Sequence, residues 1–149
     1  MQKRFVTPRR SDGFSLVEIL VVLVIMGLLI SVVAPTVLNR ADDARVQKVQ
    51  ADFKAIETAL KIYRLDNYTY PTTEQGLAAL VERSTLAPEP RNFKQGGYLA
   101  EVPRDPWGRP YLYLSPGEHG EVDIYTLGAD GLSGGEDQNA DIGNWATEE

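Results

Sequence analysis

Residues 13–35, GFSLVEILVVLVIMGLLISVVAP, form a nearly unbroken apolar run behind a basic N-terminus. Four basic residues lie in the twelve positions before the run, and Glu18 is the only charged residue inside it. The segment 14–34 has the length of roughly 20 residues that a helix needs to cross a bilayer. Because a carboxylate in such a segment is costly, Glu18 is expected to have a function.

The basic flank predicts which side of a membrane each end would occupy. Positive charge before a span favours a cytoplasmic N-terminus, and this places the rest of the chain outside the cytoplasm. A secretory signal would have a shorter apolar region, of about 7–15 residues, and a small-x-small cleavage site. The pattern thus predicts a leader at 1–13, a transmembrane segment at 14–34 and an exported globular domain at 35–149. A single-span anchor that holds an exported domain is the simplest interpretation.

Composition excludes several classes of function. The 149 residues fit one modest domain with a net charge of −6, and removal of residues 1–13 would leave about −9. An acidic chain of this kind is not expected to bind nucleic acid. His119 is the only histidine and there is no cysteine, which removes most histidine-based catalysis, most zinc sites and any disulfide.

A second helical pattern follows Pro35. Its apolar residues recur at alternating steps of three and four, which is typical of one buried helix face. We therefore expect one helix from about Phe14 to Leu65, kinked at Pro35, where an amide donor is missing. Two separate helices broken at Pro35 are the alternative. The stripe consists of Val46, Val49, Phe53, Ile56, Leu60 and Tyr63.

The remaining chain predicts short elements, so the expected fold class is α+β. Thr72 to Gln75 form a capping-box pattern that would open a short helix through Val81. Asp105 to Gly108, DPWG, fit a type I turn. The tail from Leu127 onward shows neither a helix nor a strand period. Two antiparallel strands are expected at 111–114 and 122–126, with a third near Tyr98-Leu99.

The junction at Gly13 is the most specific candidate site. Cleavage after Gly13 would leave Phe14 with a free α-amine, one helical turn from Glu18. An amine and a carboxylate in hydrocarbon cost far less when they are paired. A pair within one chain would explain nothing about assembly, whereas a pair between neighbouring chains would fix the axial register of packed helices. Gly27 and Ser31 would let such helices approach closely.

The tail offers a candidate metal site. Its carboxylates and amides are hard oxygen ligands of the kind that Ca²⁺ prefers, and a solvated acidic tail is the alternative. An EF-hand is a rival interpretation, with Glu148 at position 12, but Ile142 stands where that loop needs glycine. The Asp130→Ala change separates the two: a site that uses Asp130 should lose calcium, and an EF-hand should not. The oxygen-bearing residues are Asp130, Glu136, Asp137, Asn139 and Asp141.

Other motifs favour simpler interpretations. Residues 131–135, GLSGG, match a hydrolase pattern, but that elbow needs a helix directly after it and a later histidine. His119 lies upstream, so a serine hydrolase is disfavoured, and the histidine is interpreted as a surface residue. Trp107 and Trp145 are interpreted as packing anchors.

Several segments of the sequence resemble those of a known family. GFSLVE at 13–18 is similar to the processing signal of the type IV pilin and pseudopilin superfamily. The segments 65–77, 105–108 and 140–145 closely resemble the major pseudopilins of the type II secretion system, so the likeness covers essentially all of the chain after Gly13. The resemblance implies a pilin-like fold in which a long N-terminal helix packs on a short helix and a small sheet.

The resemblance also implies a function and partners. Prepilin peptidase would cleave between Gly13 and Phe14, and Phe14 would be N-methylated. The product would assemble from the inner membrane into a homopolymeric periplasmic fibre, with Phe14 and Glu18 setting the register and Pro35 permitting the helix to flex. Minor pseudopilins, an assembly platform and a secretion ATPase would take part, and folded proteins would be exported. A type IV pilin, a minor pseudopilin or a monomeric calcium-dependent binding domain are the alternatives.

Calcium in the C-terminal loop is a further implication of the resemblance. The matching ligands are the carbonyl groups of Leu127 and Leu132 and the carboxylates of Asp130 and Asp141, and Glu136 or Asp137 would add another. A bound ion would close the loop in a chain that has no cysteine for a disulfide. No enzymatic activity is expected.

Overall fold

The computed structural model describes residues 13–147, without the side chains of residues 32–39 and 147. The basic leader residues and Glu148 lie outside the described residues. The chain divides into two units between Arg40 and Ala41, and each is described by itself.

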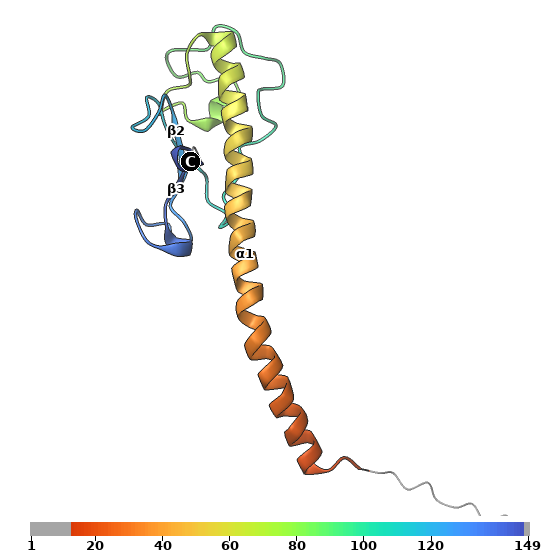
Figure 1. Ribbon diagram of the computed structural model, residues 1–149. Helices are drawn as coiled ribbons and strands as arrows, with labels where there is room; N and C mark the ends of the chain where they lie inside the picture. Colours follow the sequence, from red (N-terminus) through yellow and green to blue (C-terminus); the bar gives the residue numbers. More distant parts are fainter. Residues whose placement is uncertain (1–12, 148–149) are drawn as a thin grey trace, which may run out of the picture. The chain divides into compact units, whose positions relative to one another are not determined.

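One long helix, α1, spans Leu16–Asn67 and contains 52 residues (Figure 1). The predicted limits are confirmed to within two residues, and the alternative of two helices broken at Pro35 is wrong. A proline removes only its own amide from the hydrogen-bond ladder, so the turns on either side continue the helix. Among the residues described, no helix is both long and apolar enough to count as a membrane span.

The second half of α1 provides the main wall of the hydrophobic core. Five members of the predicted stripe are at most 2% exposed, whereas Val46 at its start is 39% exposed. Each such burial contributes roughly 1.5–3 kcal/mol of transfer free energy. The stripe is therefore what holds the second unit together. Its buried members are Val49, Phe53, Ile56, Leu60 and Tyr63.

A three-stranded antiparallel sheet lies beside this part of α1 (Figure 1). Tyr113 pairs with Ile124, and Tyr125 pairs with Gly143, so the order is β1-β2-β3. The two predicted strands are confirmed with slightly later starts. The strands are β1 at Leu112–Leu114, β2 at Asp123–Thr126 and β3 at Ile142–Gly143.

The predicted third strand near Tyr98-Leu99 is wrong. The amides of Tyr98 and Leu99 both donate to the carbonyl of Leu80, at 2.7 and 3.1 Å, so this segment binds a helix end instead of a strand. The third strand comes from the tail, which was predicted to be irregular. The tail also forms two short 3₁₀ helices, η2 at Asp137–Asn139 and η3 at Asn144–Thr147.

The predicted capping box forms, but the helix after it differs from the prediction. The Thr72 amide donates to Gln75 Oε1 at 2.9 Å, and the Gln75 amide donates to Thr72 Oγ1 at 3.2 Å. Gly76 then takes a left-handed φ of 61°, which an α-helix cannot continue through. A four-residue 3₁₀ helix, η1 at Leu77–Leu80, follows in place of the longer helix.

Candidate functional site

The N-terminal half of α1 exposes an apolar surface. The large apolar side chains between Phe14 and Ile30 are 43–79% exposed. Soluble monomers rarely expose a contiguous apolar patch larger than a few hundred Å². This surface therefore requires a lipid or protein environment, and the chain alone does not provide one among its described residues. The predicted segment 14–34 extends at residues 32–34 into the part of α1 without described side chains.

Gly13 and Glu18 lie on either side of the start of α1. Gly13 is exposed just before the helix, where an added Cβ atom would have no other atom within 4 Å. Glu18 lies in the first turn, where the helix dipole favours a negative charge. It is exposed, and no described residue forms an ion pair with it. Its carboxylate is thus available to a group outside this chain.

The acidic loop 127–141 folds back on itself. The Gly131 amide donates to the Leu127 carbonyl at 3.2 Å, and the Ala129 amide donates to the Gln138 carbonyl at 2.7 Å. A Cβ atom on Gly128 would lie 2.6 Å from the Asn139 carbonyl carbon. The loop is therefore an ordered turn structure, and glycine is needed where its two sides approach.

The Asp130 and Asp141 carboxylates both bind the backbone of this loop. Asp130 Oδ1 accepts from the Leu132 amide at 3.0 Å. Asp141 Oδ2 accepts from the Gly134 amide at 2.9 Å and from Ser133 Oγ at 3.4 Å. Ser133 is followed by glycines and not by a helix, which removes the hydrolase elbow. Carboxylate and carbonyl oxygens are the ligands that Ca²⁺ prefers, so the residue types of this loop suit that ion.

Asp137 is the third carboxylate predicted for this loop. It begins η2 with a left-handed φ of 53°, and its carbonyl accepts from the Ala140 amide at 3.3 Å. The described residues contain no group of three or more His, Cys, Asp or Glu side chains that could hold a metal ion. The candidate site therefore rests on Asp130, Asp141 and backbone oxygens, and Asp137 stays a prediction. Turns at 128–136 occupy the place of an EF-hand's entering helix, so that alternative is wrong.

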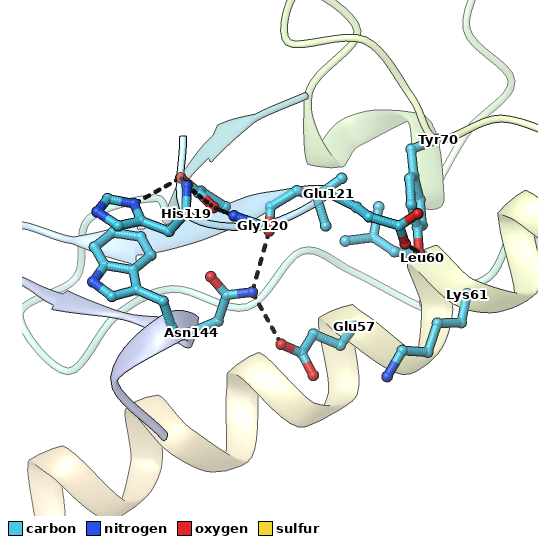
Figure 2. A pocket seen from close by; sticks show the side chains of 11 residues that line it. Glu57, Leu60, Lys61, Tyr70, His119, Gly120, Glu121 and Asn144 are labelled. Carbon is cyan, nitrogen blue, oxygen red and sulfur yellow. Dashed lines mark hydrogen bonds and ion pairs between the residues drawn. The ribbon is translucent and has the colours of Figure 1, made fainter. Parts of the chain in front are cut away.

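A separate pocket of about 220 Å³ lies between α1, the turn before β2 and the C-terminal segment (Figure 2). The rings of His119 and Trp145 stack at its edge, with centroids 3.8 Å apart and planes 11° apart. The His119 ring lies beside Asp123, whose Oδ2 is 3.0 Å from Nδ1. His119 is exposed, as the sequence indicated, and its ring in addition pairs with Asp123 and stacks on Trp145.

The Asp123 carboxylate is the centre of this arrangement. Burial raises its pKa, but hydrogen bonds from the His119 ring and from the amides of His119, Glu118 and Gly120 outweigh burial. The pKa of Asp123 therefore lies below its ordinary value. The carboxylate ties the turn 118–120 to the start of β2.

Asn144 joins the C-terminal segment to α1 and β2. Its Oδ1 accepts from the Ile124 amide at 3.0 Å, and its Nδ2 donates to Glu57 Oε1 at 3.0 Å (Figure 2). The residues that line the pocket include a His–Asp pair but no serine, threonine or cysteine that could act as a nucleophile beside it. The contacts of His119, Asp123, Asn144 and Trp145 join the C-terminal segment to the sheet and to α1, and we call this set of residues the C-terminal cluster.

The sequence did not predict the C-terminal cluster. His119, Asp123 and Trp145 come from a turn, a strand and the tail, and only the spacing of His119 and Asp123 is local. Trp145 was predicted to be a packing anchor, and its stacking on His119 gives it that role at the surface, where it is 37% exposed. Trp107 packs against the core, as predicted.

Comparisons with known proteins agree over nearly the whole chain. Residues 36–145 match the family described as "Type II secretion system (T2SS), protein G", and residues 8–34 match the prokaryotic N-terminal methylation motif. The chain is 53% identical over 137 residues to the type II secretion system core protein G of Pseudomonas aeruginosa, covering 92% of this chain and 96% of that protein. The corresponding Vibrio cholerae protein is 54% identical, with coverage of 92% and 93%.

A solved structure gives the same result. The chain is similar to the major pseudopilin from the type 2 secretion system of enterohaemorrhagic Escherichia coli, with a TM-score of 0.66 and 50% sequence identity. The match covers 73% of this chain and 93% of that one. The observed α+β arrangement over the matched part of the chain thus fits a pilin-like fold.

Proposed function

Since the chain belongs to the protein G family of the type II secretion system, we propose that it is the major structural subunit of the secretion pseudopilus. The fibre is a homopolymer in the periplasm, and its growth drives the export of folded proteins across the outer membrane. The subunit acts by assembling and has no enzymatic role. The exposed apolar half of α1 is the observation that carries this proposal, because it needs partners to cover it.

The start of α1 supports a processing step before assembly. Prepilin peptidase would cut the chain between Gly13 and Phe14, and Phe14 would be N-methylated, consistent with the methylation motif at 8–34. Gly13 is exposed and precedes the helix, so a protease can reach it. The new α-amine of one subunit would then pair with Glu18 of its neighbour, which sets the axial register.

The envelope location of this family supports a membrane-bound precursor. Residues 14–34 would span the inner membrane with the leader in the cytoplasm, and residues 35–149 would form the periplasmic domain. Helices that leave the lipid must be covered by other helices, and packing in the fibre supplies that cover. Minor pseudopilins, the assembly platform and the secretion ATPase are the proposed partners, and Pro35 is the proposed point of helix flexing.

Calcium is proposed for the loop 127–141. The Asp130 and Asp141 carboxylates and the carbonyls of Leu127 and Leu132 would hold it, with Asp137 as a further candidate. When bound, the ion would offset the loop's negative charge and close the loop by coordination. The donor set and the folded-back turn support the proposal.

Assembly is tested by expressing the full chain with prepilin peptidase and the secretion apparatus. We expect a mature N-terminus at Phe14, seen by N-terminal sequencing or mass spectrometry, and fibres in sheared-cell fractions. Glu18→Gln should abolish the fibres but not the cleavage. Ser31→Ala, in the same half of α1, keeps the small side chain that allows close helix packing and should leave both unchanged. An uncut monomer from the wild-type chain would refute the proposal.

The calcium site is tested on the full chain in detergent micelles. Calcium should raise the melting temperature and a chelator should lower it. Asp130→Ala should remove most of this difference, while Glu101→Ala, which removes the same charge at an exposed position outside the loop, should retain it. No calcium-dependent shift in the wild-type chain would eliminate the site.

A further inference from the structure

The Asp105–Arg109 turn touches the loop that we propose for calcium. The Arg109 guanidinium donates a hydrogen bond to the Gly128 carbonyl and lies against Gly131. Gly131 has a left-handed φ of 71°, and the guanidinium occupies the position that a Cβ atom would take there. The guanidinium carbon also lies over the Trp107 ring, at 5.9 Å from its centroid. One side chain therefore contacts two positions of the 127–131 turn.

Asp105 fixes this arginine in place. The carboxylate is buried, and its Oδ1 accepts from the Arg109 amide at 2.7 Å. Its Oδ2 accepts from Thr126 Oγ1 at 2.7 Å and lies 3.5 Å from Arg109 Nε. Thr126 is the last residue of β2, directly before Leu127. The guanidinium is thus anchored to the sheet, and the carboxylate offsets its charge.

We propose that Arg109 is a positioning residue for calcium in the loop 127–141. By binding Gly128 and filling the space at Gly131, it holds the 127–131 turn, which contains the Leu127 carbonyl and Asp130, in one conformation before the ion arrives. Preorganisation lowers the entropy cost of binding. This inference rests on the proposed calcium site.

Charge repulsion and positioning predict opposite effects of Arg109→Ala on the affinity for calcium. A positive side chain near a cation site repels the cation, so Arg109→Ala would tighten calcium binding if charge were its main effect. If Arg109 positions the turn, the same change weakens binding. Arg109→Lys keeps the charge but loses the planar fork that reaches Gly128, so positioning predicts weaker binding for this variant too.

The experiment is a calcium titration of the full chain in detergent micelles by isothermal calorimetry, with melting temperatures in calcium and in chelator. We expect Arg109→Ala and Arg109→Lys to raise the calcium Kd at least tenfold and to shrink the calcium-dependent rise in Tm. Arg104→Ala is the matched control, because Arg104 belongs to the same segment but donates to Gly108, at 3.0 Å. It should leave the Kd unchanged.

The outcomes separate this inference from the calcium site itself. If the wild-type chain does not bind calcium, both the proposed calcium site and the proposed role of Arg109 are refuted. If the wild-type chain binds and both Arg109 variants bind equally well or more tightly, only the positioning role is overturned. A merely structural role would lower Tm equally in calcium and in chelator. Should Arg109→Ala fail to fold, the calcium Kd of Arg109→Lys still tests the positioning role. In that variant we also expect faster hydrogen exchange at the Gly131 amide than in the wild-type chain.

Discussion

The imidazole of His119 stacks on the indole of Trp145, with ring centroids 3.8 Å apart and planes inclined by 11°. Trp145 belongs to η3, at the end of the chain, whereas His119 lies in the turn before β2. The stack therefore holds the C-terminal segment against the sheet, immediately after the loop 127–141. Aromatic pairs of this kind contribute about 0.5–1.5 kcal/mol beyond their buried area.

A double-mutant cycle on His119 and Trp145 should detect this coupling. We expect His119→Ala and Trp145→Ala each to lower the free energy of unfolding, and the double variant to cost about 0.5–1.5 kcal/mol less than their sum. Urea unfolding followed by circular dichroism gives the three values. Strict additivity would mean that the two rings do not stabilise each other.

Asp123 should make stability depend on acid pH. Its folded-state pKa lies below the ordinary value, so the carboxylate stabilises the fold above about pH 4 and loses this contribution as the pH falls through the folded-state pKa. Asp123→Asn should cost about 1–3 kcal/mol at pH 7, because the amides of residues 118–120 lose a charged acceptor. The difference between wild type and variant should shrink below pH 4. Unfolding curves between pH 3 and pH 7 measure it, and a constant difference would show that the charge of the carboxylate is not the cause.

Asn144→Asp should destabilise the domain more than the loss of one hydrogen bond alone would. The new carboxylate would face the Glu57 carboxylate and the Val122 carbonyl, both of which now accept from Asn144 Nδ2. We expect a loss of about 2–3 kcal/mol at pH 7. Adding Glu57→Gln should restore part of it, and Glu57→Gln alone is the control. If the second change rescues nothing, repulsion is not the cause.

Gly97 and Gly96 allow a matched comparison of two glycine-to-alanine changes. Both have left-handed φ values, of 77° and 88°, so alanine is strained at either position. Only at Gly97 would the Cβ atom meet other atoms, at 2.5 Å from the Val81 carbonyl oxygen. Gly97→Ala should therefore cost about 1–3 kcal/mol more than Gly96→Ala in thermal or urea unfolding. Equal costs would show that the loop moves away from η1 freely.

Several parts of this protein follow from the order of its residues alone, because they depend on local chemistry. The spacing of Val49, Phe53 and Ile56 sets the buried face of α1. Thr72 and Gln75, four residues in all from first to last, form the capping box before η1. The Gly108 amide donates to the Asp105 carbonyl at 2.9 Å, as the DPWG turn predicts. In each case the partners lie within about one turn of one another, so the residue order is enough to specify the contact.

Contacts between distant segments could be learned only from the folded chain. The third strand is Ile142–Gly143 and not Tyr98-Leu99, because the tail reaches the free edge of β2 while Tyr98 binds the end of η1. The contact of Arg109 with Gly128 and the stack of His119 on Trp145 arise in the same way. A short segment has no periodicity that identifies its partner, and the partner is chosen by which backbone groups and surfaces the rest of the fold leaves to be paired.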